Sequence, residues 1–261
     1  MTQRFVSLKS LEMAILGAVA FVTSGALVRF VSSNDADLVT TGDVRFEIIL
    51  ALCYAAVLLI FLFHLVPGFR ATFYTPATPA LLILACSSAL WAELPGLVLR
   101  RAAGLAGATL FGVVLASRLT FAEQLLLLRR VLRVIAFLSL AAWVLGLLFG
   151  VHLVTGSSTA AEGIWSSDAG GPWRGIFNHK NVLGSAVALA LLAEWHIPAG
   201  AVAARASKAV WMCAYAALLA LSNSITSAVT LVLTIVVMYA IKSFRGRYGL
   251  VLPAGLVAML F

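Results

Sequence analysis

The sequence predicts an all-α membrane protein, built as a polytopic bundle of transmembrane helices. Of the 261 residues, 62% are hydrophobic and only 11% are charged, and the mean hydropathy is +1.06. A soluble domain has about a quarter of its residues charged, so this chain has too few polar side chains to cover a surface in water. Its apolar residues also come in successive runs close to the ~20 residues that a helix needs to cross a bilayer.

These runs predict about eight or nine spans within a single membrane domain, residues 1–261. The expected helices lie near 11–31, 47–66, 78–92, 97–117, 131–154, 181–197, 208–222, 224–241 and 249–261. The runs at 208–222 and 224–241 either form two helices or one bent unit around LSNSITS. The last run stops at Phe261 after about 13 residues, too few to cross. We therefore expect the chain to be the N-terminal part of a longer protein.

The basic residues predict the orientation. With the N-terminus in the cytoplasm, the acidic loop SSNDADLVTTGDVRFE lies outside, and most basic residues lie inside, as the positive-inside rule requires. The inside set is Arg4, Lys9, Arg70, Arg118, Arg129, Arg130, Arg133, Arg205, Lys208, Lys242, Arg245 and Arg247. Because the net charge of +8 is spread over short loops, no nucleic-acid partner is expected. The predicted protein crosses the membrane several times, with its N-terminus in the cytoplasm.

The cysteines offer no metal site or disulfide. Cys53, Cys86 and Cys213 lie inside apolar runs and lack the spacing of metal ligands. We expect neither a bound metal nor a cofactor.

The stretch WRGIFNHKNVLGS, residues 173–185, is unusually polar for its surroundings. Asn181 is expected to cap the helix that follows. A helix N-terminus offers free N–H groups and favours an anion, and Arg174, His179 and Lys180 add donors beside it. The stretch therefore predicts a corner that binds a diphosphate or carboxylate at the outer membrane boundary. The alternative is that Arg174 and Lys180 only anchor the span edge.

The motif WRGIFNHKNVLG resembles the signature of the O-antigen ligase and polymerase superfamily, especially its exopolysaccharide-polymerase-like (ExoQ-like) branch. Two more stretches resemble that branch, SSALWAELPGLVLRRA and LSNSITSAVTLVL. The three stretches cover residues ~80 to 240 and occur in the same order as in the family. Their shared order is stronger evidence for the resemblance than any single motif.

The resemblance implies a GT-C-like fold and an inverting, metal-independent glycosyltransferase. Such enzymes ligate or polymerise undecaprenyl-diphosphate-linked glycans on the periplasmic face, in surface polysaccharide or exopolysaccharide biosynthesis. The implied partners are the lipid bilayer, a lipid-linked oligosaccharide, and proteins of polysaccharide export or assembly. By the same resemblance Arg174 contacts the diphosphate, and His179, Lys180 and Asn181 shape its pocket. Arg100 and Arg101 are either further phosphate contacts or interfacial anchors.

Several neighbouring polar residues have two possible roles. Trp173 and Asn178 are candidates to line the pocket. The cluster around the outward turn at LSNSITS serves either the pocket or helix packing. Its members are Ser222, Asn223, Ser224, Thr226 and Ser227. Glu194 and His196, at the far end of the helix that begins near Asn181, are expected to form an interfacial pair.

The resemblance also implies a location in the bacterial inner (plasma) membrane. It further implies a histidine base in a large periplasmic loop beyond Phe261, which is absent from this chain together with the last spans. No histidine of this sequence corresponds to it, so we assign no catalytic residue and expect this chain to be catalytically incomplete. Two other functions remain open: a polytopic transporter or flippase for an anionic substrate, and a truncated, non-catalytic membrane protein. The first is disfavoured because transporters carry charges at mid-membrane depth, whereas here they cluster at span edges.

Overall fold

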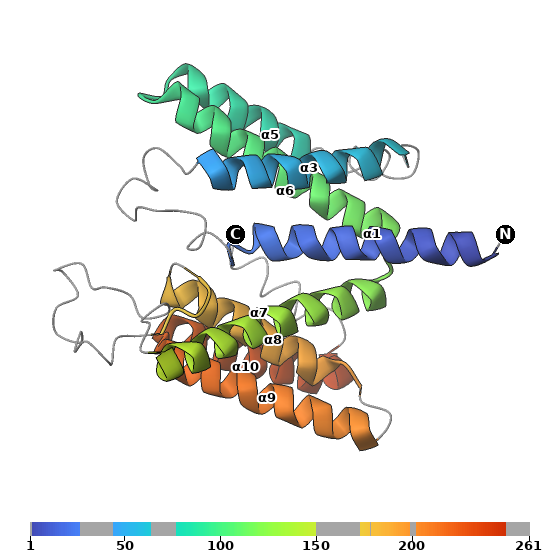
Figure 1. Ribbon diagram of the computed structural model, residues 1–261, viewed down its shortest axis with the longest axis vertical. Helices are drawn as coiled ribbons and strands as arrows, with labels where there is room; N and C mark the ends of the chain where they lie inside the picture. Colours follow the sequence, from blue (N-terminus) through green and yellow to red (C-terminus); the bar gives the residue numbers. More distant parts are fainter. Residues whose placement is uncertain are drawn as a thin grey trace. The chain divides into compact units, whose positions relative to one another are not determined.

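The computed structural model describes residues 2–26, 44–63, 77–149, 173–177, 179–198 and 202–248. In these ranges the chain forms eight α-helices and one short 3-10 helix, and no strand (Figure 1). The helices are α1 (Thr2–Thr23), α3 (Val44–Phe63), α5 (Ala77–Ser87), α6 (Pro95–Arg118), α7 (Phe121–Phe149), α8 (Lys180–His196), α9 (Val202–Ser222) and α10 (Ile225–Tyr248), with η1 (Ser88–Leu90) after α5. The all-α prediction is confirmed.

Eight of the predicted apolar runs correspond to these helices, and the run at 249–261 lies outside the described residues. The runs at 208–222 and 224–241 form two helices rather than one bent unit. The chain breaks at Asn223, whose φ of 47° lies in the left-handed region, which Asn adopts more readily than most residues.

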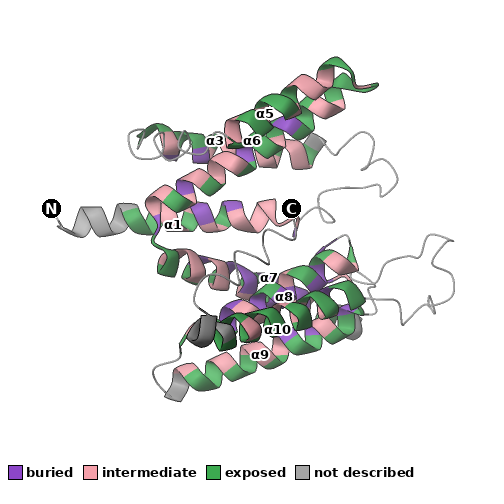
Figure 2. Ribbon diagram, turned by 180° about the vertical axis from the view of Figure 1, so that it is seen from behind, coloured by how far each residue is buried: buried purple, intermediate pink, exposed green. Residues whose placement is uncertain are grey.

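Three of the described helical segments are long and apolar enough to cross a membrane: Arg45–Phe63, Pro95–Arg118 and Ile225–Ser243. Few residues of these three segments are buried within the protein. Leu52 on α3 is 66% exposed and Val232 on α10 is 61% exposed, and exposed positions recur along every labelled helix (Figure 2). Large apolar side chains exposed in such numbers need a lipid or protein partner. The structure therefore supports a membrane protein, while the total of eight or nine spans stays a prediction.

The chain divides into two compact units. Unit 1 is Met1–Val154 with Gly175–Asn178, and unit 2 is Thr155–Arg174 with His179–Phe261.

In unit 1, α1, α3, α6 and the start of α7 surround an apolar core. Its buried members are Leu16, Val19, Val57, Ile60, Val114, Leu119 and Leu127. The close approach of α3 and α6 depends on Gly107, because a Cβ there would lie 2.4 Å from the Tyr54 ring. Small residues allow such backbone proximity between membrane helices.

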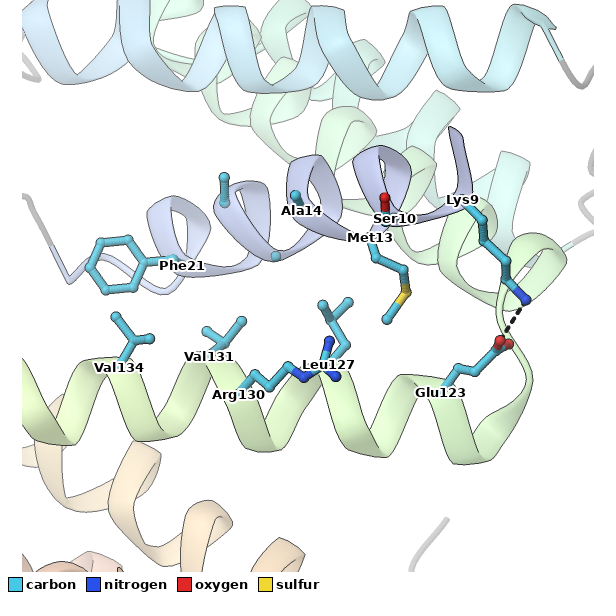
Figure 3. Close-up of a pocket in the computed structure, with 12 residues that line it drawn as sticks. Lys9, Ser10, Met13, Ala14, Phe21, Glu123, Leu127, Arg130, Val131 and Val134 are labelled. Atoms are coloured by element: carbon cyan, nitrogen blue, oxygen red, sulfur yellow. Dashed lines mark hydrogen bonds and ion pairs between the residues drawn. The ribbon is translucent and has the colours of Figure 1, made fainter. Parts of the chain in front are cut away.

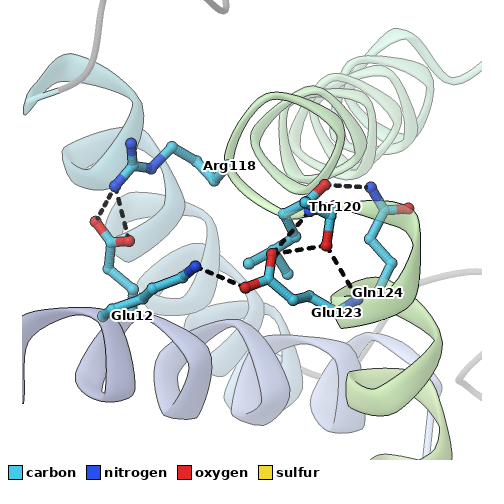
Figure 4. A network of polar contacts seen from close by, with 7 residues as sticks. Glu12, Arg118, Thr120, Glu123 and Gln124 are labelled. Carbon is cyan, nitrogen blue, oxygen red and sulfur yellow. Dashed lines mark hydrogen bonds and ion pairs between the residues drawn. The ribbon is translucent and has the colours of Figure 1, made fainter. Parts of the chain in front are cut away.

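Charged residues at one end of unit 1 are paired across three helices (Figure 4). Lys9 Nζ on α1 lies 2.6 Å from Glu123 Oε1 on α7. Arg118 Nη2, at the end of α6, donates to both carboxylate oxygens of Glu12, each at 3.0 Å. Glu123 also accepts from the backbone N–H of Thr120 at 2.9 Å, and the Thr120 hydroxyl accepts from the Glu123 N–H at 3.4 Å. Thr120 and Glu123 thus form a capping box at the start of α7.

A third ion pair marks the opposite end of the same unit. Arg100 Nη1 in α6 lies 3.2 Å from Glu47 Oε1 in the first turn of α3. From Arg100 to Arg118, α6 rises about 27 Å, close to the ~30 Å of hydrocarbon in a bilayer. The ion pairs of unit 1 therefore lie near the two boundaries that a membrane would impose, with the apolar core between them.

In unit 2, α8 packs against both α9 and α10. At its C-terminal end, Lys208 Nζ on α9 donates to the carbonyl oxygens of Trp195, at 3.0 Å, and Ile197, at 2.9 Å. A cation at this end also suits the helix dipole. Glu194 is only 1% exposed, and His196 Nδ1 lies 2.8 Å from the Leu192 carbonyl oxygen. The Glu194 face of α8 is turned into the unit, and the predicted interfacial depth of Glu194 stays a prediction.

Candidate functional site

The first turn of α8 begins one residue earlier than the sequence predicts. His179 is the N-cap, with extended backbone (φ −135°, ψ 137°), and its Nδ1 accepts the Asn181 N–H at 3.2 Å. The prediction that Asn181 caps the helix is wrong. A histidine nitrogen meets the same need for an acceptor at a helix start, although His is not among the residues usually preferred there.

The Asn181 side chain is bonded to the α9–α10 turn instead. Its Oδ1 accepts from Ser224 Oγ at 3.0 Å, and its backbone carbonyl accepts from Ser227 Oγ at 3.5 Å. The two serine hydroxyls lie 2.9 Å apart. The start of α8 and the start of α10 are thus joined by a small, buried hydroxyl–amide network.

This junction is close because Gly184 has no side chain. A Cβ at Gly184 would lie 2.7 Å from both Ser224 Cβ and Ser227 Oγ. Ser224 and Ser227 are each 4% exposed, and Ser222 is 0% exposed with its hydroxyl bonded to the Leu219 carbonyl. These three serines take part in packing at this junction, and their expected role in lining the pocket stays a prediction. Asn223 is exposed.

Trp173 joins the polar stretch to the same turn. Its backbone N–H donates to the Leu221 carbonyl oxygen at 3.2 Å, and the residue is 4% exposed. The next residue in the chain, Arg174, is half-buried. Unit 2 therefore brings together Trp173–Arg174, the start of α8 and the α9–α10 turn, which come from two of the three motif segments.

Other predicted site residues lie elsewhere or outside the description. Asn178 lies outside the described residues. Residues 175–177 belong to unit 1, where the Ile176 N–H donates to Ser139 Oγ at 3.4 Å. Arg100 and Arg101 also belong to unit 1. The ion pair of Arg100 with Glu47 favours the anchoring role over phosphate contact for that residue.

A groove beside Asn181 was not predicted from the sequence. It measures about 230 Å³ and runs between α8 and α10. Its polar members are Asn181, Ser185, Thr226, Ser227, Thr230 and Thr234. The signal is present in the sequence as threonines spaced by four, which places them on one helix face. Thr226 lines this groove, and its expected role in the diphosphate pocket stays a prediction.

The groove threonines are partly satisfied by their own helix. Thr230 Oγ1 donates to the Thr226 carbonyl at 2.8 Å, and Thr234 Oγ1 donates to the Thr230 carbonyl at 2.7 Å. Across the groove, the Ser185 and Ser227 hydroxyls lie 3.4 Å apart. The hydroxyl oxygens keep acceptor capacity for a ligand.

The start of α8 carries a partial positive charge, and Lys180 is its first helical residue. The N–H groups of Asn181, Val182 and Leu183 already donate to His179, so the groups that an anion would contact here are the cationic side chain of Lys180 and that of Arg174 on the adjoining segment. Among the described residues, no group of three or more His, Cys, Asp or Glu is placed to hold a metal ion.

The fold and the exposed apolar surface together define a helical membrane protein. Comparisons with protein-family models, curated proteins and solved structures found no match. A particular function is therefore argued from the residues of the site and from the motif resemblance.

Proposed function

We propose that the protein is a membrane glycosyltransferase-like component of surface polysaccharide biosynthesis. In this proposal it binds undecaprenyl-diphosphate-linked glycans at the periplasmic face, where they are ligated to an acceptor or polymerised. One observation carries the proposal. The motif segments WRGIFNHKN and LSNSITS, whose bonded residues Ser224 and Asn181 are 43 positions apart, meet at the start of α8.

The proposed role of this corner is to hold the diphosphate. A lipid diphosphate carries several negative oxygens, and charge grows on it as it leaves the sugar. Cations and a helix N-terminus fixed in advance stabilise such a leaving group. Arg174 supplies a planar fork that matches two oxygens at once, and Lys180 supplies a compact charge at the helix N-terminus.

The transporter alternative remains second. Each of the three described ion pairs of unit 1 includes a residue in the first or last turns of a helix, Glu123, Glu47 or Arg118, whereas substrate-coupled charges in transporters usually lie at mid-membrane depth.

The functional test replaces Arg174 in the protein expressed from its own gene. We expect Arg174→Ala to reduce surface polysaccharide on the order of 10²-fold, the effect of losing one leaving-group donor. Arg174→Lys keeps the charge but not the fork, so it should restore only part of the polymer.

The matched control is Arg205→Ala, which removes an exposed arginine from the first turn of α9. Membrane abundance of each variant is measured by immunoblot, and polymer by gel. Normal polymer in Arg174→Ala at normal abundance would remove Arg174 from the site.

A further inference from the structure

A groove of about 850 Å³ lies in unit 1 between α1 and α7, apart from the site described above (Figure 3). The two helices run in the same direction along it. Lys9 and Glu123 meet at one end, and Phe21 and Val134 face each other at the other end (Figure 3). From Lys9 to Phe21, α1 rises about 18 Å, close to the ~15 Å thickness of one leaflet's hydrocarbon.

The walls of the groove are apolar. α1 contributes the small residues Ala14, Gly17 and Ala18, and α7 contributes Leu127, Val131 and Val134. A Cβ at Gly17 would lie 3.3 Å from Leu127 Cδ1, so the helices nearly touch at this level. A hydrocarbon chain is narrower than a third helix, which is about 10 Å wide.

The mouth of the groove is cationic. It carries Lys9, Glu123 and Arg130, two positive charges and one negative, for a net charge of +1. Lys9 and Glu123 pair with each other. Arg130 is exposed, and its side chain runs along α7 toward Glu123 (Figure 3), the direction that helical side chains favour. Arg129 and Arg133 on the same helix add to the positive potential.

We propose that this groove holds an acyl chain of an anionic phospholipid, with the lipid phosphate against Arg130 and Lys9. The lipid comes from the leaflet at the Lys9 end of unit 1, which the charge bias of the sequence predicts to be the cytoplasmic one. The apolar wall supplies the affinity for the chain, and the basic mouth supplies the preference for a negative headgroup.

The test is native mass spectrometry of the purified protein in detergent, titrated with phosphatidylglycerol or with phosphatidylcholine of the same acyl chains. The wild type should bind phosphatidylglycerol more tightly. Arg130→Gln should weaken phosphatidylglycerol binding about fivefold, the effect of one basic residue near an anionic lipid, and leave phosphatidylcholine binding unchanged. Arg205→Gln, which removes a basic residue outside the groove, should change neither.

A second variant tests the chain-binding wall. Val134 is 49% exposed, so Val134→Phe fills the groove without overpacking a buried site, and it should weaken the binding of both lipids to the same extent. Three outcomes would overturn the proposal: equal binding of the two lipids by the wild type, an Arg130→Gln effect no larger than that of Arg205→Gln, or unchanged lipid binding in Val134→Phe. A second protein copy in place of lipid would overturn it too.

Discussion

At the residue scale, the absence of one side chain decides how the candidate site is built. Gly184 lets the first turns of α8 approach the α9–α10 turn until Ser224 and Ser227 reach the Asn181 main chain and side chain. The polar groups of the junction are buried, and burial makes each unmade hydrogen bond costly. The junction therefore fixes where the α8 N-terminus points.

Gly184→Ala should destabilise the protein by about 1–3 kcal/mol, because the added Cβ overpacks against Ser224. The control is Gly104→Ala on α6, where a Cβ would meet nothing within 4 Å and the gain in helix propensity should stabilise by up to about 1 kcal/mol. Thermal unfolding in detergent compares the two. A Gly184→Ala protein as stable as the Gly104→Ala protein would contradict the close approach.

The Asn181–Ser224 hydrogen bond is tested by a double-mutant cycle. We expect Asn181→Ala and Ser224→Ala each to destabilise the protein, with a coupling energy of about 0.5–1.5 kcal/mol between them. Additive effects of the two substitutions on the free energy of unfolding would show that the bond contributes nothing.

At the element scale, the start of α7 couples a helix cap to an ion pair. The Lys9 ammonium lowers the pKa of Glu123 to about 2, helped by the Thr120 N–H and hydroxyl. A carboxyl whose pKa is lower in the folded than in the unfolded state stabilises the fold above the unfolded pKa, and this stabilisation is lost as the pH falls through the folded pKa. The relevant window runs from pH 4.5 down to about 2.

Glu123→Gln should therefore lower the unfolding temperature at neutral pH, and the difference from wild type should shrink as the pH falls below 4.5. When Lys9 is also replaced by Gln, the effect of Glu123→Gln on the unfolding temperature should be smaller at every pH, because Lys9 is the main cause of the lowered pKa of Glu123. Thermal unfolding from pH 7 to the lowest pH the detergent tolerates measures both effects. A difference that grows in acid would contradict the assignment.

The positions of the helices were predictable, because apolar runs mark each of them. Their pairings were not, since Lys9 meets a residue 114 positions away and hydropathy does not specify partners. At the site, the sequence indicated the polar stretch and the serine cluster as separate features. Their junction depends on Gly184, which closes the motif WRGIFNHKNVLG but does not by itself name the segment it approaches, and the cap at His179 departs from usual preferences.

At the scale of the whole molecule, the charge distribution supports insertion in a bilayer. Unit 1 holds its ion pairs at two levels about 27 Å apart along α6, and three helices are long and apolar enough to cross. The direction of crossing, with the N-terminus inside, is predicted from the loop charges.

Cysteine labelling tests that direction. In a variant with Cys53, Cys86 and Cys213 replaced by alanine, Glu93→Cys should react with a membrane-impermeant maleimide in intact spheroplasts. Thr120→Cys, near the other end of α6, should react only after permeabilisation. The reverse pattern would invert the topology and move the candidate site to the cytoplasmic side.

The central claim is that the corner at the start of α8 binds a lipid diphosphate, and its most direct test is the affinity of the purified protein for undecaprenyl diphosphate. We predict binding that inorganic diphosphate displaces and that Arg174→Ala weakens by at least about tenfold, the loss of one charge-assisted hydrogen-bonded contact, with Arg205→Ala unchanged. No binding by the wild type, or equal binding by wild type and Arg174→Ala, would contradict the claim.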